Sequence, residues 1–356
     1  MVLRVATSAL HKLRRLGGAV LAPVRRRRYA KTYESRDLVN GRLPVIYISQ
    51  IWRSGGTMLS QFFDSVPGIL AFPKELKFGV GKRDLLCLDE WCERPAPEVR
   101  HEFMRVNGVF GDAMRGRYDK SSGASLPFRF DVGLFSYLFD RSWKDHPPRS
   151  GRDLASIFFS AFFSAWLDRR SSTQPPRYIS GFASFMALRP ENVDRYFGYY
   201  PDGYLIQIIR EPVAWYRSVR AKSLRGLPAA AGSAKDKRSI DRAIEMYRQQ
   251  GITLGDNLRK HPGRCFLLDY DKLVADPDSH MAGLCELLGL EYSEIASQAT
   301  FNGLPIAPNT SFRNVPIPRE SILSANEIHQ IEREAIPIYE EAARLTGLPL
   351  RLVASQ

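Results

Sequence analysis

The stretch that decides the fold is IYISQIWRSGGTMLSQFFD, residues 46–64. Its first residues, from Ile46 to Ile48, are apolar and are typical of a buried strand. Two glycines, Gly55 and Gly56, then allow a tight turn, and apolar residues at helical spacing follow from Met58. A strand that turns on glycines into a helix aims backbone N–H groups and the positive end of the helix dipole at one point. We therefore expect a phosphate or sulfate site at this turn.

The side chains of the turn support the same expectation. Arg53 adds a full positive charge, and Ser54 and Thr57 add hydroxyl donors. The turn is not a Walker A loop, because Ile51 occupies the place of the first glycine and no lysine precedes Thr57. A nucleotide kinase of the standard type is therefore disfavoured. The competing interpretation is an ordinary glycine-rich connection without a ligand.

A second candidate anion site lies in IIREPVAWYRSVR, residues 208–220. Arg210 follows the predicted strand 204–209, and Ser218 lies eight residues later on a predicted helix. Ligands of open α/β sheets bind at the carboxyl ends of the strands, where an arginine can make a forked contact with a phosphate. Alternatively, Pro212 marks only the start of the helix.

The rest of the chain indicates an α/β fold with a mainly parallel central sheet flanked by helices. Further strands are predicted at 45–48, 177–180 and 265–268, and helices at 154–166, at 281–288 and after a capping box at 324–327. Residues 111–153 show no periodicity and are expected to form an irregular insertion, either an acceptor loop or a surface feature. We expect a basic tail over residues 1–36 and a single domain over 37–356.

These motifs resemble the sulfotransferase family, over about residues 43–315. Arg53 to Thr57 resemble its 5′-phosphosulfate loop, Arg210 and Ser218 its 3′-phosphate site, and FLLDYDKLVADP (266–277) a later segment of the family. The resemblance implies a P-loop NTPase-like fold. It also implies transfer of a sulfuryl group from 3′-phosphoadenosine 5′-phosphosulfate to a hydroxyl or amine, without a metal. Arg53, Ser54, Gly55, Gly56 and Thr57 would then hold the phosphosulfate, and Arg53 would also stabilise the transition state.

Transfer to a hydroxyl needs a general base within hydrogen-bond reach. Glu75 in PKELKF (73–78) lies 22 residues after Arg53, which resembles the glutamate placement of heparan sulfate sulfotransferases. The resemblance implies that Glu75 is the base and that the acceptor is a carbohydrate or glycolipid. The competing interpretation makes Glu75 a solvated charge on a turn. His101 is a second candidate for the base, and Asp64 is interpreted as a surface residue of the helix.

The loop FNGLPIAPNTSFRN, residues 301–314, resembles an Asn-Ser-Ser-Phe segment of bacterial sulfotransferases. Thr310 departs from that pattern. The resemblance makes Ser311 and Arg313 candidate phosphate contacts, although loops rich in proline and asparagine often only turn the chain.

The composition and charge of the chain limit the classes of function that it can have. The chain has 356 residues, of which 44% are hydrophobic and 25% charged, so it can bury a core. It has no run of about 18 apolar residues that would span a membrane. The net charge of +13 is concentrated in residues 1–36, which hold ten basic residues and one acid. The nearly neutral remainder argues against a nucleic-acid partner.

The four cysteines form no CxxC pair and no zinc-type cluster, so we interpret them as reduced, mostly buried thiols of a cytoplasmic protein. The basic tail has three interpretations: a disordered segment, an amphipathic helix on a membrane surface, or a cleaved presequence. Two other functions stay open at this point. They are a nucleotide-dependent kinase with an atypical phosphate loop and a non-catalytic, membrane-associated adaptor.

Overall fold

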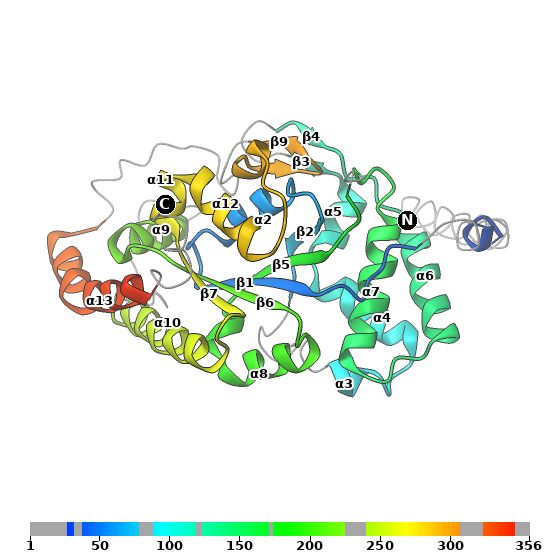
Figure 1. Ribbon diagram of the computed structural model, residues 1–356, viewed down its shortest axis with the longest axis horizontal. Coiled ribbons are helices and arrows are strands. Elements are labelled where there is room, and N and C mark those ends of the chain that lie inside the picture. The colour runs from blue at the N-terminus through cyan, green and yellow to red at the C-terminus, as the bar shows by residue number, and fades with distance from the viewer. Residues whose placement is uncertain are drawn as a thin grey trace, which may run out of the picture.

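The computed structural model describes residues 27–31, 38–77, 88–118, 123–170, 174–224, 240–306 and 323–345. Its centre is a five-stranded sheet in the order β2-β5-β1-β6-β7, and every neighbouring pair is parallel (Figure 1). The strands span β1 Val45–Gln50, β2 Ile69–Glu75, β5 Tyr178–Ser184, β6 Tyr204–Ile209 and β7 Cys265–Asp269. The predicted parallel sheet with flanking helices is confirmed.

The two faces of the sheet follow from the alternation of side chains along each strand. Val45 and Tyr47 of β1 pack into one cluster with the helices α4 to α8. Ile46 and Ile48 face the opposite cluster, which contains α2, α11 and α12. These helices span α2 Gly56–Phe63, α4 Ala96–Val106, α5 Val109–Arg115, α6 Val132–Asp145, α7 Gly151–Ala165, α8 Pro190–Tyr199, α11 Tyr270–Ala275 and α12 Pro277–Leu287. A strand buried on both faces reads as a continuous apolar run, as β1 does.

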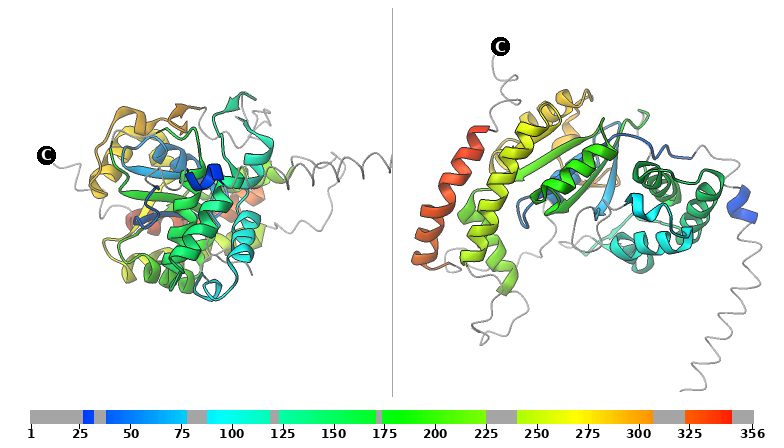
Figure 2. Two further views of the ribbon diagram at one scale, coloured as in Figure 1. Left: turned by 90° about the vertical axis from the view of Figure 1, so that its right-hand side faces the viewer. Right: turned by 90° about the horizontal axis from the view of Figure 1, so that it is seen from below.

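A third cluster closes the end of the sheet at β6 and β7. Ile209 and Leu267 pack there against three helices, α9 Pro212–Leu224, α10 Ile240–Lys260 and α13 Ala325–Leu345. Figure 2 shows α10 and α13 side by side at one end of the molecule and the group α3 to α7 at the other, where α3 spans Leu88–Trp91. The capping box before α13 is confirmed: the Ser324 N–H donates to Glu327 Oε2 at 2.8 Å, and the Glu327 N–H donates to Ser324 Oγ at 3.3 Å.

Strand β2 is an element that the sequence analysis missed. Pro73 lies inside it and lacks the N–H that a ladder needs, which restricts such a residue to an edge strand or a bulge. Both conditions hold, because β2 is the edge of the sheet and its pairing with β5 shifts register between Ala71 and Glu75. The bulged strand ends at Glu75, at the same edge of the sheet as the ends of β1 and β6.

The prediction of an irregular insertion at 111–153 is wrong for residues 132–145, which form α6. The carboxylate of Asp131 caps this helix by accepting the Leu134 N–H at 2.9 Å. The buried residues Phe135, Leu138 and Phe139 then follow helical spacing. What remains of the segment includes a short hairpin, β3 Arg117–Tyr118 with β4 Ser125–Leu126. A second short hairpin, β8 Thr300–Phe301 with β9 Leu304–Pro305, follows later in the chain.

Three of the four cysteines fall within the described residues, and all three are free thiols. Burial raises the pKa of Cys265 to about 12 and that of Cys285 to about 11, so both stay protonated at neutral pH. Cys87 lies outside the described residues, as does nearly all of the basic tail 1–36. None of the helices in the described part of the chain is long and apolar enough to cross a membrane.

Candidate active site

A cavity of about 820 Å³ opens at the carboxyl edge of the sheet. One side is formed by the glycine turn after β1 and by the start of α2. The ends of β2 and β5, helix α5, the hairpin β3–β4 and strand β8 contribute further lining residues. Open α/β sheets bind ligands at this edge, because the connections after neighbouring strands diverge there. Four of the five residues of the predicted phosphosulfate loop line this cavity, namely Arg53, Gly55, Gly56 and Thr57. Ser54 lies beside the cavity and does not line its wall.

The glycine turn is built in a way that only glycine allows. Gly55 has a φ of +108°, in the left-handed region, and precedes the first residue of α2. A Cβ atom on Gly55 would lie 2.1 Å from the ring of Tyr270, and one on Gly56 would lie 2.3 Å from the side chain of Gln50. A side chain at Gly55 would therefore collide with the Tyr270 ring, and one at Gly56 would have to displace the amide end of Gln50. The first N–H groups of a helix have no partner within it, so they are available to an anion.

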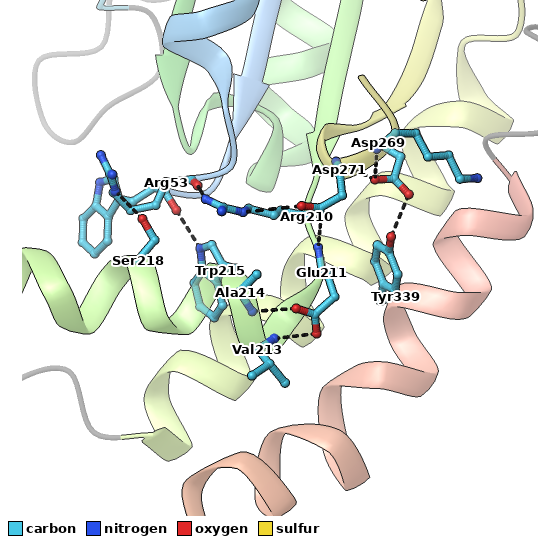
Figure 3. A network of polar contacts seen from close by, with 12 residues as sticks. Arg53, Arg210, Glu211, Val213, Ala214, Trp215, Ser218, Asp269, Asp271 and Tyr339 are labelled. Atoms are coloured by element: carbon cyan, nitrogen blue, oxygen red, sulfur yellow. Dashed lines mark hydrogen bonds and ion pairs between the residues drawn. The ribbon is translucent and has the colours of Figure 1, made fainter. Parts of the chain in front are cut away.

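The two predicted anion sites meet in space. Arg53 Nε donates a hydrogen bond to Ser218 Oγ at 2.9 Å, although 165 residues separate them (Figure 3). An Nη atom of Arg210 donates to the carbonyl oxygen of Arg53, also at 2.9 Å. The guanidinium carbon of Arg210 lies 4.5 Å from the centre of the Tyr270 ring, a cation–π distance. Arg53, Arg210 and Ser218 thus form one group beside the glycine turn.

Two polar atoms, one in the glycine turn and one in this group, are buried without a hydrogen-bond partner among the described residues. They are the Oγ of Ser54, a fully buried residue, and the Nε of Arg210. Burying a donor without a partner costs about 1–3 kcal/mol, so such atoms are rare unless a ligand or water satisfies them. The many hydrogen-bond donors around these two atoms suit the phosphate and sulfate groups of a nucleotide.

Acidic residues that sequence analysis did not identify hold Arg210 in place. Asp271 Oδ2 accepts the Glu211 N–H at 2.8 Å, and Asp271 Oδ1 lies 4.0 Å from Arg210 Nε (Figure 3). The Glu211 carboxylate caps α9 by accepting the N–H groups of Val213 and Ala214, at 2.8 and 2.6 Å. The sequence signal for this cap was a glutamate directly before the proline that starts the helix.

The network also reaches α13. Asp269 caps α11 by accepting the Asp271 N–H at 2.9 Å, and it accepts the hydroxyl hydrogen of Tyr339 at 2.7 Å (Figure 3). Through these contacts the last described helix is tied to the end of β7, next to Arg210.

Glu75 lines the cavity with one third of its side chain exposed. Its Oε1 accepts the Ser184 N–H at 3.4 Å, and its Oε2 contacts the ammonium group of Lys77. His101 lies exposed on α4 and is not part of the described cavity wall. Geometry therefore favours Glu75 over His101 as the group that meets an acceptor.

A chain of charged side chains runs along the cavity wall beyond Glu75. Lys74 Nζ lies 2.8 Å from Asp112 Oδ1, and an Nη atom of Arg117 lies 3.4 Å from Asp112 Oδ2. Burial lowers the pKa of Arg117 to about 10, although the charges of the nearby Asp112 and Asp64 act in the opposite direction and raise it. Arg117 therefore stays charged at neutral pH.

The interpretation of Asp64 as a surface residue is wrong, because it lines the cavity. Its carboxylate accepts the hydroxyl hydrogen of Thr300 and the Gly303 N–H, both at 2.9 Å. Burial raises the pKa of Asp64, and these hydrogen bonds and Arg117 only partly oppose the rise. Asp64 ends up here because β8–β9 folds over the end of α2, a contact that local sequence does not reveal.

Ser311 and Arg313 lie outside the described residues. The described part of the chain also holds no group of three His, Cys, Asp or Glu side chains that would bind a metal ion.

Comparison with known proteins places these features in a family. The model of the sulfotransferase family matches residues 44–294, which is more than two thirds of the chain and includes Arg53, Glu75, Arg210 and Ser218. No curated protein sequence matches the chain.

Solved structures also resemble the chain, at low sequence identity. The sulfotransferase domain of the Synechococcus PCC 7002 olefin synthase is 15% identical; the alignment covers 87% of this chain and 96% of that one, with a TM-score of 0.45. A sulfotransferase from Alicyclobacillus acidocaldarius is 12% identical, with coverage of 85% and 95% and a TM-score of 0.43. Retinol dehydratase, solved with androsterone and the inactive cofactor PAP, is 14% identical, with coverage of 90% and 86% and a TM-score of 0.31.

Proposed function

The chain belongs to the sulfotransferase family, and we propose that it transfers a sulfuryl group from 3′-phosphoadenosine 5′-phosphosulfate to an acceptor hydroxyl, with Glu75 as the general base. One observation carries this proposal. Arg53, Arg210 and Ser218 converge beside a glycine turn that opens into the same cavity as Glu75. The glycine turn and Glu75 thus line one cavity, and Arg210 and Ser218 contact the turn through Arg53.

Each donor-binding residue has a role that its position supports. The N–H groups at the start of α2, with Ser54 and Thr57, would hold the 5′-phosphosulfate. Arg210 and Ser218 would hold the 3′-phosphate, to which the Nε of Arg210 could donate because it makes no hydrogen bond within the described residues. Arg53 lies between the two positions and touches both Ser218 and, through its carbonyl oxygen, Arg210.

The reaction exchanges one S–O bond for another. The acceptor oxygen bonds to sulfur while the bond from sulfur to the bridging oxygen of the donor breaks, and the bisphosphate leaves with that electron pair. Glu75 takes the acceptor proton. Arg53 remains protonated at all working pH values, so it stabilises the charge that builds up on the leaving oxygens rather than donating a proton.

The placement of Glu75 after the glycine turn supports a carbohydrate or glycolipid acceptor, because it is similar to that in heparan sulfate sulfotransferases. A transfer assay tests this function. The protein is incubated with donor carrying a labelled sulfuryl group and a mixture of glycans and glycolipids, and the label is followed by chromatography. We expect label in a glycan or glycolipid product. Label that stays on the donor or appears only as free sulfate would contradict the proposal.

A further inference from the structure

The charges on the cavity wall restrict the class of acceptor. Four basic and three acidic side chains line the described part of the cavity: Arg53, Lys74, Lys77 and Arg117, and Asp64, Glu75 and Asp112. Arg53 belongs to the glycine turn, where the donor is expected. The other six lie on the side where an acceptor must approach Glu75.

Each basic group on this acceptor side already has a carboxylate beside it. Lys74 Nζ lies 2.8 Å from Asp112, and Lys77 contacts Glu75. Arg117 lies 3.4 Å from Asp112 and also feels the charge of Asp64. Among the described residues of the acceptor side, three cations thus face three carboxylates, and each cation has a carboxylate beside it. This described part of the wall has no surplus cation to offer an anionic acceptor.

A bound donor would make the cavity still less suitable for an anion. Its phosphate and sulfate groups bring several negative charges to the glycine turn, next to the position that the acceptor must reach. Like charges in a partly desolvated cavity repel strongly. An acidic acceptor would therefore need compensating cations, and the described wall has already paired them.

A purely apolar acceptor fits no better. It would cover these ion pairs and remove water from them, which is costly unless other hydrogen bonds replace those of water. Hydroxyl groups can both donate to Asp64 or Asp112 and accept from Arg117 or Lys74. The wall therefore presents donors and acceptors together, as an array of hydroxyls requires.

The same cavity offers exposed aromatic surface. Trp52 is 47% exposed and Tyr118 is 57% exposed, and both line the cavity. The guanidinium group of Arg117 packs on the ring of Phe301, with its carbon 4.2 Å from the ring centre. A sugar ring combines a C–H face that packs on aromatic rings with a rim of hydroxyls.

We propose that the acceptor is an uncharged sugar, whose hydroxyls are held by the wall of Lys74, Asp112, Arg117 and Asp64, and that acidic sugars are excluded by the charge balance of this wall. This inference rests on the proposed function and narrows it. It makes Asp112 a specificity-determining residue, since this one carboxylate pairs with both Lys74 and Arg117.

The test compares matched neutral and acidic sugars as acceptors. Transfer of labelled sulfuryl groups is measured to the methyl β-D-glucoside and galactoside, to their dodecyl forms in micelles, and to the methyl glucuronide and galacturonide. We expect kcat/KM for the best neutral glycoside to exceed that for either acidic one by about tenfold or more. Preference for the methyl or the dodecyl form distinguishes a free sugar from a glycolipid headgroup, and either supports the proposal.

Two results would overturn the inference while leaving the proposed function intact. One is an acidic sugar that equals or exceeds the neutral ones. The other is a protein that binds 3′-phosphoadenosine 5′-phosphate but transfers to none of the neutral glycosides. A protein that does not bind this bisphosphate would overturn the proposed function itself, and this inference with it.

Substitution of Asp112 tests the cause of the preference. Asp112→Asn leaves Lys74 and Arg117 without their shared carboxylate, so we expect the neutral-to-acidic preference to fall by about fivefold or more. Asp256→Asn is the control, because Asp256 forms an exposed pair with Arg259 on α10. Lys74→Gln should shift the preference the opposite way. An unchanged preference in both Asp112→Asn and Lys74→Gln would contradict the inference.

Discussion

At the scale of single residues, the site depends on groups that hydrogen-bond in two directions. Arg210 donates a hydrogen bond to the carbonyl oxygen of Arg53, while its buried Nε has no hydrogen-bond partner among the described residues. In our proposal this residue both shapes the glycine turn and binds the 3′-phosphate.

Removing Arg210 should therefore weaken donor binding selectively. We expect Arg210→Ala to raise the Kd for 3′-phosphoadenosine 5′-phosphate by about 10- to 100-fold, because a charge-assisted hydrogen bond contributes about 1.5–3 kcal/mol. Titration calorimetry measures this, with Arg259→Ala, an exposed arginine on α10, as the control. An unchanged Kd would remove Arg210 from the 3′-phosphate site.

Glu75 is the residue on which turnover should depend most. Glu75→Gln keeps the size of the side chain but removes the base, so we expect kcat to fall by about 10²- to 10⁴-fold while bisphosphate binding stays within about twofold. Glu98→Gln, at an exposed position of α4, should leave both quantities unchanged. Full activity in Glu75→Gln would exclude Glu75 as the base.

Asp64 should make stability depend on pH. Its folded-state pKa is raised above the usual 3.8 by burial, so the folded state binds the proton more tightly than the unfolded state does. The resulting stabilisation is complete below the unfolded pKa and is lost as the pH rises through the raised folded pKa. We expect Asp64→Asn, which keeps an oxygen acceptor and carries no charge, to gain stability relative to wild type at pH 7 and to lose that gain near pH 3.

Urea unfolding at the two pH values measures this difference. A destabilisation by Asp64→Asn at pH 7 that persists unchanged at low pH would mean that the hydrogen bonds from Thr300 and Gly303, and not burial of the charge, dominate at this position.

At the scale of elements, the connection from β1 to α2 couples the fold to the site. The backbone at Gly55 lies against the Tyr270 ring, which in turn lies under Arg210. The turn, the start of α11 and the end of β6 are therefore packed as one unit.

Gly55→Ala should destabilise the protein in two ways, through backbone strain and through a collision with the Tyr270 ring. We expect it to lower the free energy of unfolding by about 1–2 kcal/mol through its left-handed φ, and by more through the collision with Tyr270. Gly263→Ala is a matched control, since Gly263 has a φ of +72° and open space around its Cα. If the two variants lose equal stability and bind the bisphosphate equally well, the close packing at Gly55 is not important.

Elements with strong local signals could be predicted from the sequence. The apolar runs of β1, β6 and β7 and the capping box of α13 were readable because the signal lies within a few neighbouring residues. Strand β2 was not, because Pro73 argues against a strand and only its edge position and bulge accommodate it. The same bulge brings Glu75 to the cavity, so its role was suggested by resemblance and not by pattern.

At the scale of the whole molecule, the site combines residues from distant parts of the chain. Arg53 and Ser218 could each be predicted as a ligand-binding residue because each belongs to a motif, but the hydrogen bond between them could not. The wall of Lys74, Asp112, Arg117 and Asp64 could not be predicted, because its four residues come from β2, α5, β3 and the end of α2, and no single motif connects them. Only the folded chain brings them together.

The central claim is that the cavity binds an adenosine 3′,5′-bisphosphate rather than ATP. Titration calorimetry of the full chain with 3′-phosphoadenosine 5′-phosphate, and separately with ATP and Mg²⁺, tests it most directly. We expect micromolar binding of the bisphosphate and no detectable binding of ATP. Binding of ATP in its place would indicate a kinase, and binding of neither would reduce the glycine turn to a structural connection.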